Sequence, residues 1–167
     1  MSVIESIACY GDSVGRARLY VSGGDPVYSY LWDNGETSVI ANALTSGFHT
    51  VSLIDDWGCE VVDSIYMPEN AEIESVITVD STVSCYGESD GSAWITSTGG
   101  TPSYTYFWSN DPIGHTNMPD TVTGLSYGSY YVITRDNLGC EVVDSIYISE
   151  PEPLIMEASE LDWIDCF

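Results

Sequence analysis

The chain of 167 residues carries 26 acidic and only 3 basic side chains, for a formal net charge of −23. Such a surface repels phosphate backbones and anionic membranes, so we expect no nucleic-acid binding. No apolar run approaches the length of about 18 residues that a membrane-spanning helix needs, so we expect no membrane insertion in this segment. The chain can nevertheless bury a core, since 44% of its residues are hydrophobic and 12% are aromatic.

Two long stretches of the sequence repeat. The segment that begins at Cys9 reads CYGDSVGRARLYVSGGDPVYSYLWDNG, and the segment that begins at Cys85 reads CYGESDGSAWITSTGGTPSYTYFWSND. Both copies later contain the identical run GCEVVDSIY, and the second copy carries an insertion of five residues near 110–120. We therefore expect one repeat over 1–68 with a truncated first strand, a second over 72–150, and the start of a third over 154–167, as in a window of a longer array.

Each repeat is typical of a short-stranded β-sandwich. Near the start of each repeat, apolar side chains occupy every second position, which predicts a strand. A Gly-Gly turn follows, and after it aromatic side chains occupy every second position of a second strand. In the first repeat, Asp33-Asn34-Gly35 then predicts a tight hairpin turn. About seven short strands per repeat predict an all-β chain of two tandem immunoglobulin-like, PKD-like β-sandwich repeats plus the first strand of a third. The linkers at 68–72 and 150–153 contain proline, which stiffens the joints between units. The strand positions are 17–21, 28–32, 51–53 and 61–65 in the first repeat and 93–95, 104–108, 130–132 and 142–148 in the second.

The frame C-[YF]-G-x-S-x-G-x-A … G-G-x-P-x-Y-x-Y-x-W … G … D-x-x-G-C … E-P, which the two repeats share, resembles the SprB-type tandem repeat of Bacteroidota gliding-motility adhesins. The resemblance covers nearly the whole chain, twice, and departs from the pattern only at the insertion near 110–120. The resemblance implies a very long filamentous protein, at the cell surface or secreted, that is exported by the type IX system, and it supplies no enzyme activity.

Five cysteines in an acidic chain indicate an oxidising, extracellular location. One pairing places a disulfide within each repeat, between Cys9 and Cys59 and between Cys85 and Cys140. This pairing within repeats is the one we favour from the sequence, ahead of a pairing across the joint and of free thiols. Sandwich topology raises a difficulty for it, because the two cysteines of one repeat would lie at opposite ends of the sandwich, so the second pairing stays open. Stacked units would instead bring Cys9 to Cys140 across the joint. Cys166 has no partner within the chain in either scheme.

Carboxylates concentrate in the turns and linkers that would meet where units stack. Oxygen ligands of this kind suit calcium, so we weigh a calcium site against a solvated acidic surface that keeps a long polymer soluble. The candidate ligands are Asp12, Asp55, Asp56, Asp136, Glu69 and Glu150. No other cofactor is expected.

Two tryptophans, Trp57 and Trp94, are not repeated in the other unit and should be exposed. Exposed indoles could stack on a surface polysaccharide or cover a neighbouring unit. The triplet Asp-Ser/Thr-apolar also recurs and resembles an O-glycosylation acceptor motif of Bacteroidota. Its acceptor positions would be Ser13, Ser64, Thr121 and Ser145.

The sequence contains no motif that indicates catalysis. The two histidines, His49 and His115, occupy non-equivalent positions in the two repeats, so they cannot form a repeated metal site or Cys–His pair. The sequence therefore predicts a structural repeat module of a long extracellular adhesin or filament, with neighbouring repeats or copies of itself as partners. One alternative is a carbohydrate-binding accessory module of a secreted enzyme. Another is a self-assembling surface fibre, in which the terminal strand 154–164 would complete a sandwich in the next chain by strand addition.

Overall fold

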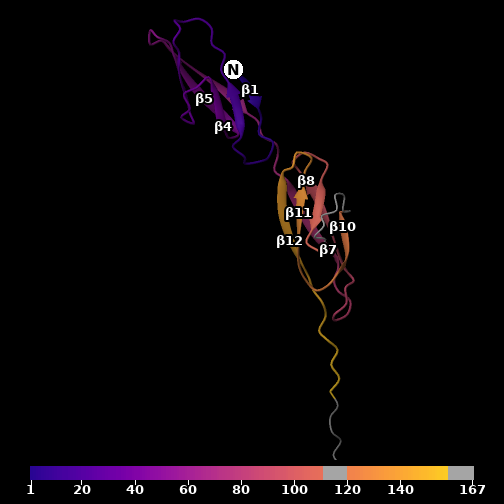
Figure 1. Cartoon of the computed structure of the whole chain (residues 1–167). Coiled ribbons are helices and arrows are strands. Elements are labelled where there is room, and N and C mark those ends of the chain that lie inside the picture. The colour runs from indigo at the N-terminus through magenta and orange to yellow at the C-terminus, as the bar shows by residue number, and fades with distance from the viewer. Residues whose placement is uncertain (111–119, 158–167) are drawn as a thin grey trace, which may run out of the picture.

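The computed structural model describes residues 1–110 and 120–157. All regular structure in these residues is β-strand, and the strands form two units that lie end to end (Figure 1). The strands of the first unit are β1 (Ser2–Glu5), β2 (Gly15–Arg18), β3 (Ser29–Trp32), β4 (Ile40–Leu44), β5 (Gly47–Ile54) and β6 (Glu60–Met67). The strands of the second unit are β7 (Glu74–Ser81), β8 (Gly91–Thr98), β9 (Thr105–Trp108), β10 (Thr121–Leu125), β11 (Gly128–Arg135) and β12 (Glu141–Ile148).

Each unit is a sandwich of two three-stranded antiparallel sheets. The sheets are β1-β2-β4 and β3-β5-β6 in the first unit, and β7-β8-β10 and β9-β11-β12 in the second. The predicted all-β fold with two tandem immunoglobulin-like units is confirmed. The expected count of about seven strands is wrong, because each unit has six strands in the described residues.

The alternating pattern read from the sequence places one face of each strand in the core. Trp32 and its repeat equivalent Trp108 are each 1% exposed, and Ala17 and its equivalent Ala93 are fully buried. Most other core positions also recur between the units, so the two sandwiches have the same packing plan. The other recurring buried pairs are Ile7 and Val83, Leu19 and Ile95, Ala41 and Val122, Leu44 and Leu125, Val51 and Val132, and Met67 and Ile148.

The chain entering β11 forms the tyrosine corner typical of immunoglobulin-type sandwiches. The Tyr130 hydroxyl donates to the backbone carbonyl of Ser126 at 3.0 Å. In the first unit His49 takes this place, and its Nε2 lies 2.9 Å from the carbonyl oxygen of Thr45. The two histidines were expected to form no repeated metal site, and His49 is here a structural replacement for a tyrosine.

The turn predicted at Asp33-Asn34-Gly35 is present but does not join two paired strands. The N–H of Gly35 donates to the carbonyl of Trp32 at 2.9 Å, which closes the turn. However, β3 pairs with β5, whereas the next strand, β4, pairs with β2 in the opposite sheet. The turn therefore starts a crossover between sheets, because a local turn signal does not specify which strands pair.

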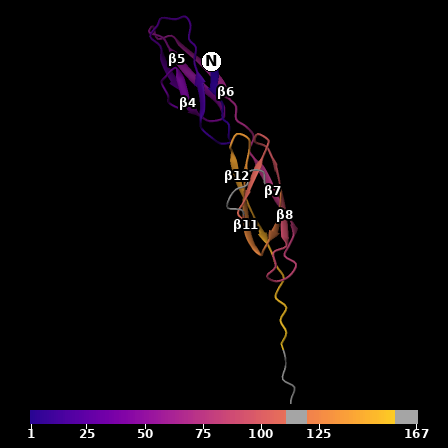
Figure 2. The ribbon, with the colours of Figure 1, turned by 45° about the vertical axis from the view of Figure 1, so that its right-hand side comes forward.

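Beyond β12 the chain runs away from the second unit as an extended segment (Figure 2). Residues 151–157 form no strand. The predicted first strand of a third repeat within 154–167 is therefore absent from 154–157, and its remainder lies outside the described residues. No helix in residues 1–110 or 120–157 is long and apolar enough to cross a membrane.

Candidate functional site

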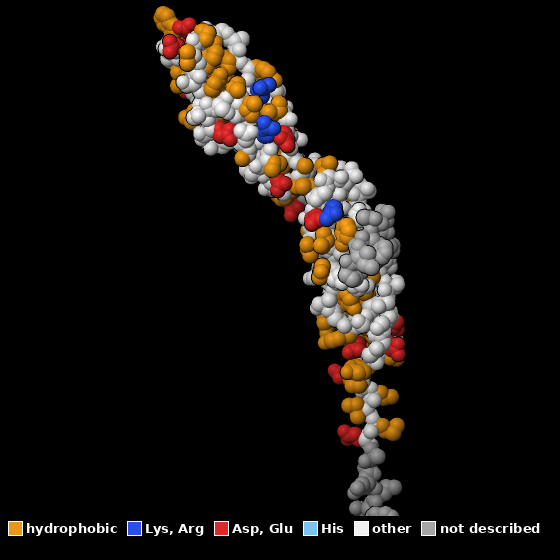
Figure 3. Space-filling view, in the orientation of Figure 1, with side chains coloured by type: hydrophobic (Ala, Val, Ile, Leu, Met, Phe, Trp, Pro, Cys, Tyr) orange, Lys and Arg blue, Asp and Glu red, His pale blue; other side chains and the backbone are white. Residues whose placement is uncertain are grey.

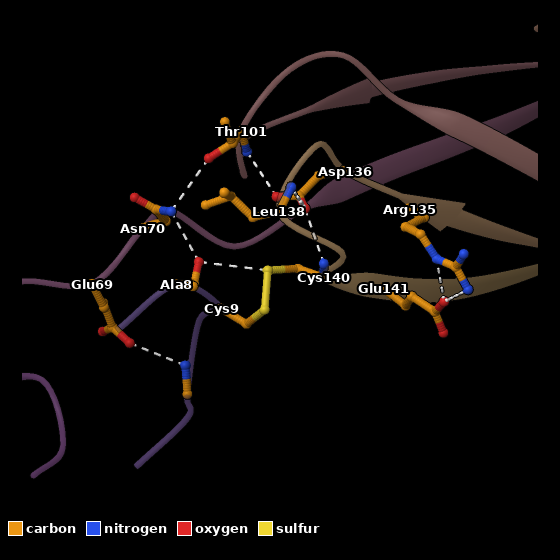
Figure 4. The surroundings of a disulfide bond; sticks show 11 residues. Ala8, Cys9, Glu69, Asn70, Thr101, Arg135, Asp136, Leu138, Cys140 and Glu141 are labelled. Atoms are coloured by element: carbon orange, nitrogen blue, oxygen red, sulfur yellow. Dashed lines mark hydrogen bonds and ion pairs between the residues drawn. A yellow bond between two sulfur atoms is a disulfide. The ribbon is translucent and has the colours of Figure 1, made fainter. Parts of the chain in front are cut away.

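A disulfide between Cys9 and Cys140 joins the two units at the point where they meet (Figure 4). Cys9 lies in the turn between β1 and β2, and Cys140 lies in the turn between β11 and β12. Their Cα atoms are 5.4 Å apart although 131 positions separate them in the sequence. Of the two pairings that the sequence left open, the structure contains the one across the joint.

The pairing within repeats is wrong for a geometric reason. Cys59 directly precedes β6, whereas Ile7, two positions before Cys9, bridges to Glu69 just beyond the end of β6. An eight-residue strand spans roughly 26 Å, so Cys9 and Cys59 lie at opposite ends of the sandwich. A disulfide requires Cα atoms within about 7 Å. The same separation rules out the pair of Cys85 with Cys140.

The turn that carries Cys140 is built around the carboxylate of Asp136. Its Oδ1 accepts from the backbone N–H groups of Leu138 and Cys140, both at 2.9 Å, and its Oδ2 accepts from Thr101 N–H at 2.9 Å. Burial acts to raise the pKa of Asp136, which is only 5% exposed, but the N–H donors outweigh burial and hold this pKa below its usual value. Asp136 is therefore a charged acceptor that fixes the disulfide turn.

Asp55 plays the same part in the first unit. Its Oδ1 accepts from the backbone N–H groups of Trp57 at 3.1 Å and Cys59 at 2.8 Å. The N–H of Cys59 is the main cause that lowers the pKa of Asp55. The Cys59 turn thus has the form of the Cys140 turn, although its own cysteine is exposed and unbonded.

The linker contacts both units through Asn70. Its Nδ2 donates to the carbonyl of Ala8 at 2.9 Å and to the Thr101 hydroxyl at 3.3 Å (Figure 4). At the next residue, the carbonyl of Ala71 accepts from the N–H of Gly100 at 3.0 Å. These bonds fix the linker against the first unit on one side and against the β8–β9 turn of the second unit on the other.

A second pair of carboxylates holds the turns that carry the other two cysteines. Glu69 Oε2 accepts from the N–H of Gly11 at 3.0 Å, and Glu150 Oε2 accepts from the equivalent Gly87 N–H at 2.9 Å. The Ser46 hydroxyl, together with this Gly11 contact, lowers the pKa of Glu69. The recurrence shows that these glutamates are structural.

The structure does not gather the six candidate calcium ligands into a site. In residues 1–110 and 120–157 no group of three or more His, Cys, Asp and Glu side chains is placed to hold a metal ion. Four of the six carboxylates already accept hydrogen bonds from backbone N–H groups within their own units. These bonds hold the carboxylates apart, so they do not converge on a common metal position. These four are Asp55, Asp136, Glu69 and Glu150. The other two, Asp12 and Asp56, are exposed.

The candidate surface residues lie on the outside of the molecule. Trp57 is 81% exposed at the tip of the β5–β6 turn, where its indole N–H donates to Asp25, and Trp94 on β8 is 36% exposed. All candidate glycosylation acceptors are exposed: Ser13, Ser64, Thr121 and Ser145. The insertion near 110–120 falls almost entirely on 111–119 and, with Cys166, lies outside the described residues.

Comparison with known protein families found a match to the repeated segment of this chain. A family model for the SprB repeat matches residues 1–37 and 77–112. The resemblance is thereby confirmed in both units. The two matches begin near equivalent positions of the first strand and end just after the buried tryptophan, so they cover the sequence that forms β1–β3 and most of β7–β9. The chain is thus similar to this repeat over the first half of each of its two units.

Several solved structures are similar to the chain at low identity and low TM-score. Three N-terminal domains of the outer capsid protein Hoc of bacteriophage RB49 match at 17% identity and a TM-score of 0.43, over 87% of this chain and 58% of that one. A C-terminal fragment of intimin in complex with the intimin-binding domain of Tir matches at 13% identity and a TM-score of 0.45, over 88% and 62%. Domains 4 and 5 of the S-layer protein SbsC match at 15% identity and a TM-score of 0.29, over 87% and 92%. The chain thus spans about three fifths of the first two structures, and no curated protein matches it.

Sequence reasoning missed the structural use of the acidic residues. It grouped Asp136 and Glu150 as metal ligands, whereas both accept hydrogen bonds from backbone N–H groups. The signal that could have found them is recurrence at fixed offsets, since an aspartate precedes the second cysteine of each unit by four positions. Asn70 gave no such signal, because its equivalent in the next linker is Pro151.

Proposed function

We propose that this chain is a stiff structural segment of a long extracellular repeat protein, in which each unit acts as a spacer. The observation that carries the proposal is the Cys9–Cys140 disulfide, which fastens consecutive units end to end. A flexible linker alone would let the units swing, whereas a second covalent connection beside the linker restricts their relative motion. This role is non-catalytic.

Location at the cell surface follows the same reasoning. A disulfide persists in an oxidising compartment, and the match to the SprB repeat supports a surface-exposed adhesin related to gliding motility, exported by the type IX system. The acidic surface, with a net charge of −23, would keep such a polymer soluble and extended. Antibodies raised against this chain should label intact cells of the organism that produces it. Labelling only after lysis would contradict this part of the proposal.

Small-angle scattering tests the mechanical claim. The oxidised chain should give the narrow distance distribution of one elongated particle. In the double variant Cys9→Ser/Cys140→Ser, each unit should still unfold cooperatively on heating. Its distribution of interatomic distances should be broader, because only the linker and the Asn70 contacts would still join the units. The variant Cys59→Ser/Cys85→Ser, which removes two exposed thiols, is the matched control and should scatter like the unmodified chain. Identical curves for all three would refute the role of the disulfide in stiffening the array.

One observation supports carbohydrate binding as a second candidate. Trp57 presents a largely exposed indole at one end of the molecule. Its repeat equivalent, Leu138, lies beside Cys140 at the joint (Figure 4), and this position favours contact with a neighbouring unit over binding of a sugar. If the chain binds polysaccharide and Trp57→Ala abolishes the binding, the sugar-binding alternative is correct.

A further inference from the structure

We propose that the Cys9–Cys140 disulfide carries tension from one unit to the next, so that a pulling force passes around the two β-sandwich cores and does not unfold them. This inference goes beyond the proposed spacer role, which concerns how the units are held relative to each other in the absence of load. It rests on where the two cysteines lie in the order of the strands, and on the directions of the strands that lead to them and away from them.

The disulfide closes a loop that contains most of the chain. Its two cysteines are 131 positions apart, and ten strands, β2 to β11, lie between them. Of the described residues that are fully buried in the two hydrophobic cores, only Ile7 and Ile148 lie outside this loop. A force that enters the chain before Cys9 and leaves it after Cys140 therefore has a covalent route that does not pass through the loop.

The strands outside the loop run directly to and from the joint. β1 runs toward the joint, because Ile7, two positions after this strand, bridges to Glu69 at the start of the linker. β12 begins directly after Cys140 and runs away from the joint, and the chain then leaves the far end of the second unit (Figure 2). The units meet end to end in an elongated molecule (Figure 3). Tension along the long axis therefore enters through β1 and leaves through β12.

This covalent route is already close to its full length. A β-strand rises by about 3.3 Å per residue, which is close to the limit of about 3.3–3.6 Å per residue for a stretched chain. Between the two strands, the route crosses the disulfide, where the Cα atoms of Cys9 and Cys140 are 5.4 Å apart. The route therefore gains little length under load, whereas the enclosed loop would lengthen greatly if the force passed through it.

The forces on β12 oppose each other within one strand. Its first residue, Glu141, is held through Cys140, and its last residue, Ile148, is pulled in the opposite direction. Its eight residues all pair with β11, but forces at the two ends of the same strand transfer little net load to that neighbour. When the disulfide is reduced, the same force reaches β12 only through the folded units and the linker. Hydrogen bonds and packing must then resist it, and these are weak beside a covalent bond.

The hydrogen bonds at the joint cannot replace the disulfide in this role. The Asn70 side chain donates to the Ala8 carbonyl at 2.9 Å and to the Thr101 hydroxyl at 3.3 Å. The backbone N–H of Gly100 donates to the Ala71 carbonyl at 3.0 Å. These bonds hold the linker in place without load, but under tension they break before a covalent bond does. The tensile role is therefore specific to the disulfide.

Single-molecule force spectroscopy, with peptide handles on the two termini, tests the proposal. The chain carries Cys59→Ser, Cys85→Ser and Cys166→Ser, so that Cys9 and Cys140 are its only cysteines. The fully stretched oxidised chain should be shorter than the reduced chain by roughly 450 Å, since the 131 positions in the loop would each add about 3.3–3.6 Å. Before that point the oxidised chain should show no step of the size of a unit, whereas the reduced chain should show two. Adding Cys9→Ser/Cys140→Ser should give the reduced pattern under oxidising conditions. Equal lengths for the oxidised and reduced chains would overturn the proposal.

A substitution inside the loop shows whether the second core bears load. An added Cβ at Gly91 would lie 2.9 Å from the carbonyl oxygen of Leu125, so Gly91→Ala should weaken the second unit. In the reduced chain, this variant should lower the force of one unfolding step, and the exposed control Thr96→Ala should not. In the oxidised chain, both variants should give the force–extension curve of the parent. A shift of the oxidised curve by Gly91→Ala would show that load passes through the core and would contradict the proposal, while the scattering test, which applies no load, would stand independently.

Discussion

The carboxylate of Asp136 accepts a hydrogen bond from the backbone N–H of Cys140, so the residue that shapes the β11–β12 turn also positions one sulfur of the disulfide between units. The equivalent Asp55 makes the same bond to Cys59 in a turn that bears no disulfide. The aspartate therefore shapes the turn whether or not the cysteine of that turn forms a disulfide. Substitutions of Asp55 and Asp136 can thus be compared for their effects on stability.

Replacement of Asp136 by alanine should destabilise the second unit by about 2 kcal/mol, since a buried charged acceptor of three N–H groups is lost. Denaturant unfolding of the chain, followed by tryptophan fluorescence, measures the change. Asp55→Ala is the matched variant and should have a smaller effect, because Asp55 is more exposed to solvent, which can replace its hydrogen bonds. An Asp136→Ala variant as stable as the parent would contradict the role assigned to this carboxylate.

Acid should unfold the chain through the same group of carboxylates. The pKa values of Asp55, Glu69 and Asp136 are lowered in the folded state, so the unfolded chain binds more protons once the pH falls below about 4. The contribution of these carboxylates to the free energy of unfolding is therefore fully present above the pKa values that they have in the unfolded chain. It is lost as the pH falls through the lower pKa values that they have in the folded chain. Circular dichroism melts between pH 6 and pH 2 should show a melting temperature that falls steeply at the acid end. Asp136→Asn should reduce this fall, and a melting temperature that rises steadily down to pH 2 would exclude the mechanism.

Close packing at the start of β8 makes Gly91 sensitive to substitution. A Cβ at this position would lie 2.9 Å from the carbonyl oxygen of Leu125 and 3.0 Å from Ile148 Cγ2. Gly91→Ala should cost about 1–3 kcal/mol, because either the neighbouring strand or the core must move. Thr96→Ala, an exposed position on the same strand, is the control and should change stability by less than about 0.5 kcal/mol. A Gly91→Ala variant as stable as the parent chain would show that the strands can move apart without loss of stability, and would contradict this prediction.

Asn70 should limit motion between the units even when the disulfide is reduced. Its side chain bonds to Ala8 and to Thr101, one residue in each unit. In the reduced chain, Asn70→Ala should let the two units tumble more independently, with shorter rotational correlation times by ¹⁵N relaxation. Asn137→Ala, at an exposed position of the β11–β12 turn, is the control and should leave the correlation times unchanged. Unchanged tumbling for Asn70→Ala would assign the whole restraint to the linker backbone.

The sequence predicted the sandwich well because a period-two pattern directly encodes which side chains face a core. The alternation around Trp32 and Trp108 identified strands and buried tryptophans in both units. It did not specify strand pairing, so the turn at 33–35 was assigned to a hairpin although β3 and β4 lie in different sheets. Pairing depends on contacts far apart in the sequence, which a local pattern cannot report.

The joint was only partly predictable for a related reason. The expected topology placed Cys9 and Cys59 at opposite ends of a unit, and this made a pairing of Cys9 with Cys140 conceivable from the sequence alone. The sequence left the acidic residues open between a calcium site and a solvated surface, because composition gives their number but not their hydrogen-bond partners. The partners are backbone N–H groups, such as that of Gly87 for Glu150, and a backbone group leaves no residue-type signal in the sequence.

Disulfide mapping of the oxidised chain by mass spectrometry tests the central claim most directly. Digestion under non-reducing conditions should release a peptide in which Cys9 is bonded to Cys140, and it should disappear on reduction. Recovery instead of Cys9 bonded to Cys59, or of Cys85 bonded to Cys140, would show that each unit closes on itself and would contradict the account of the joint.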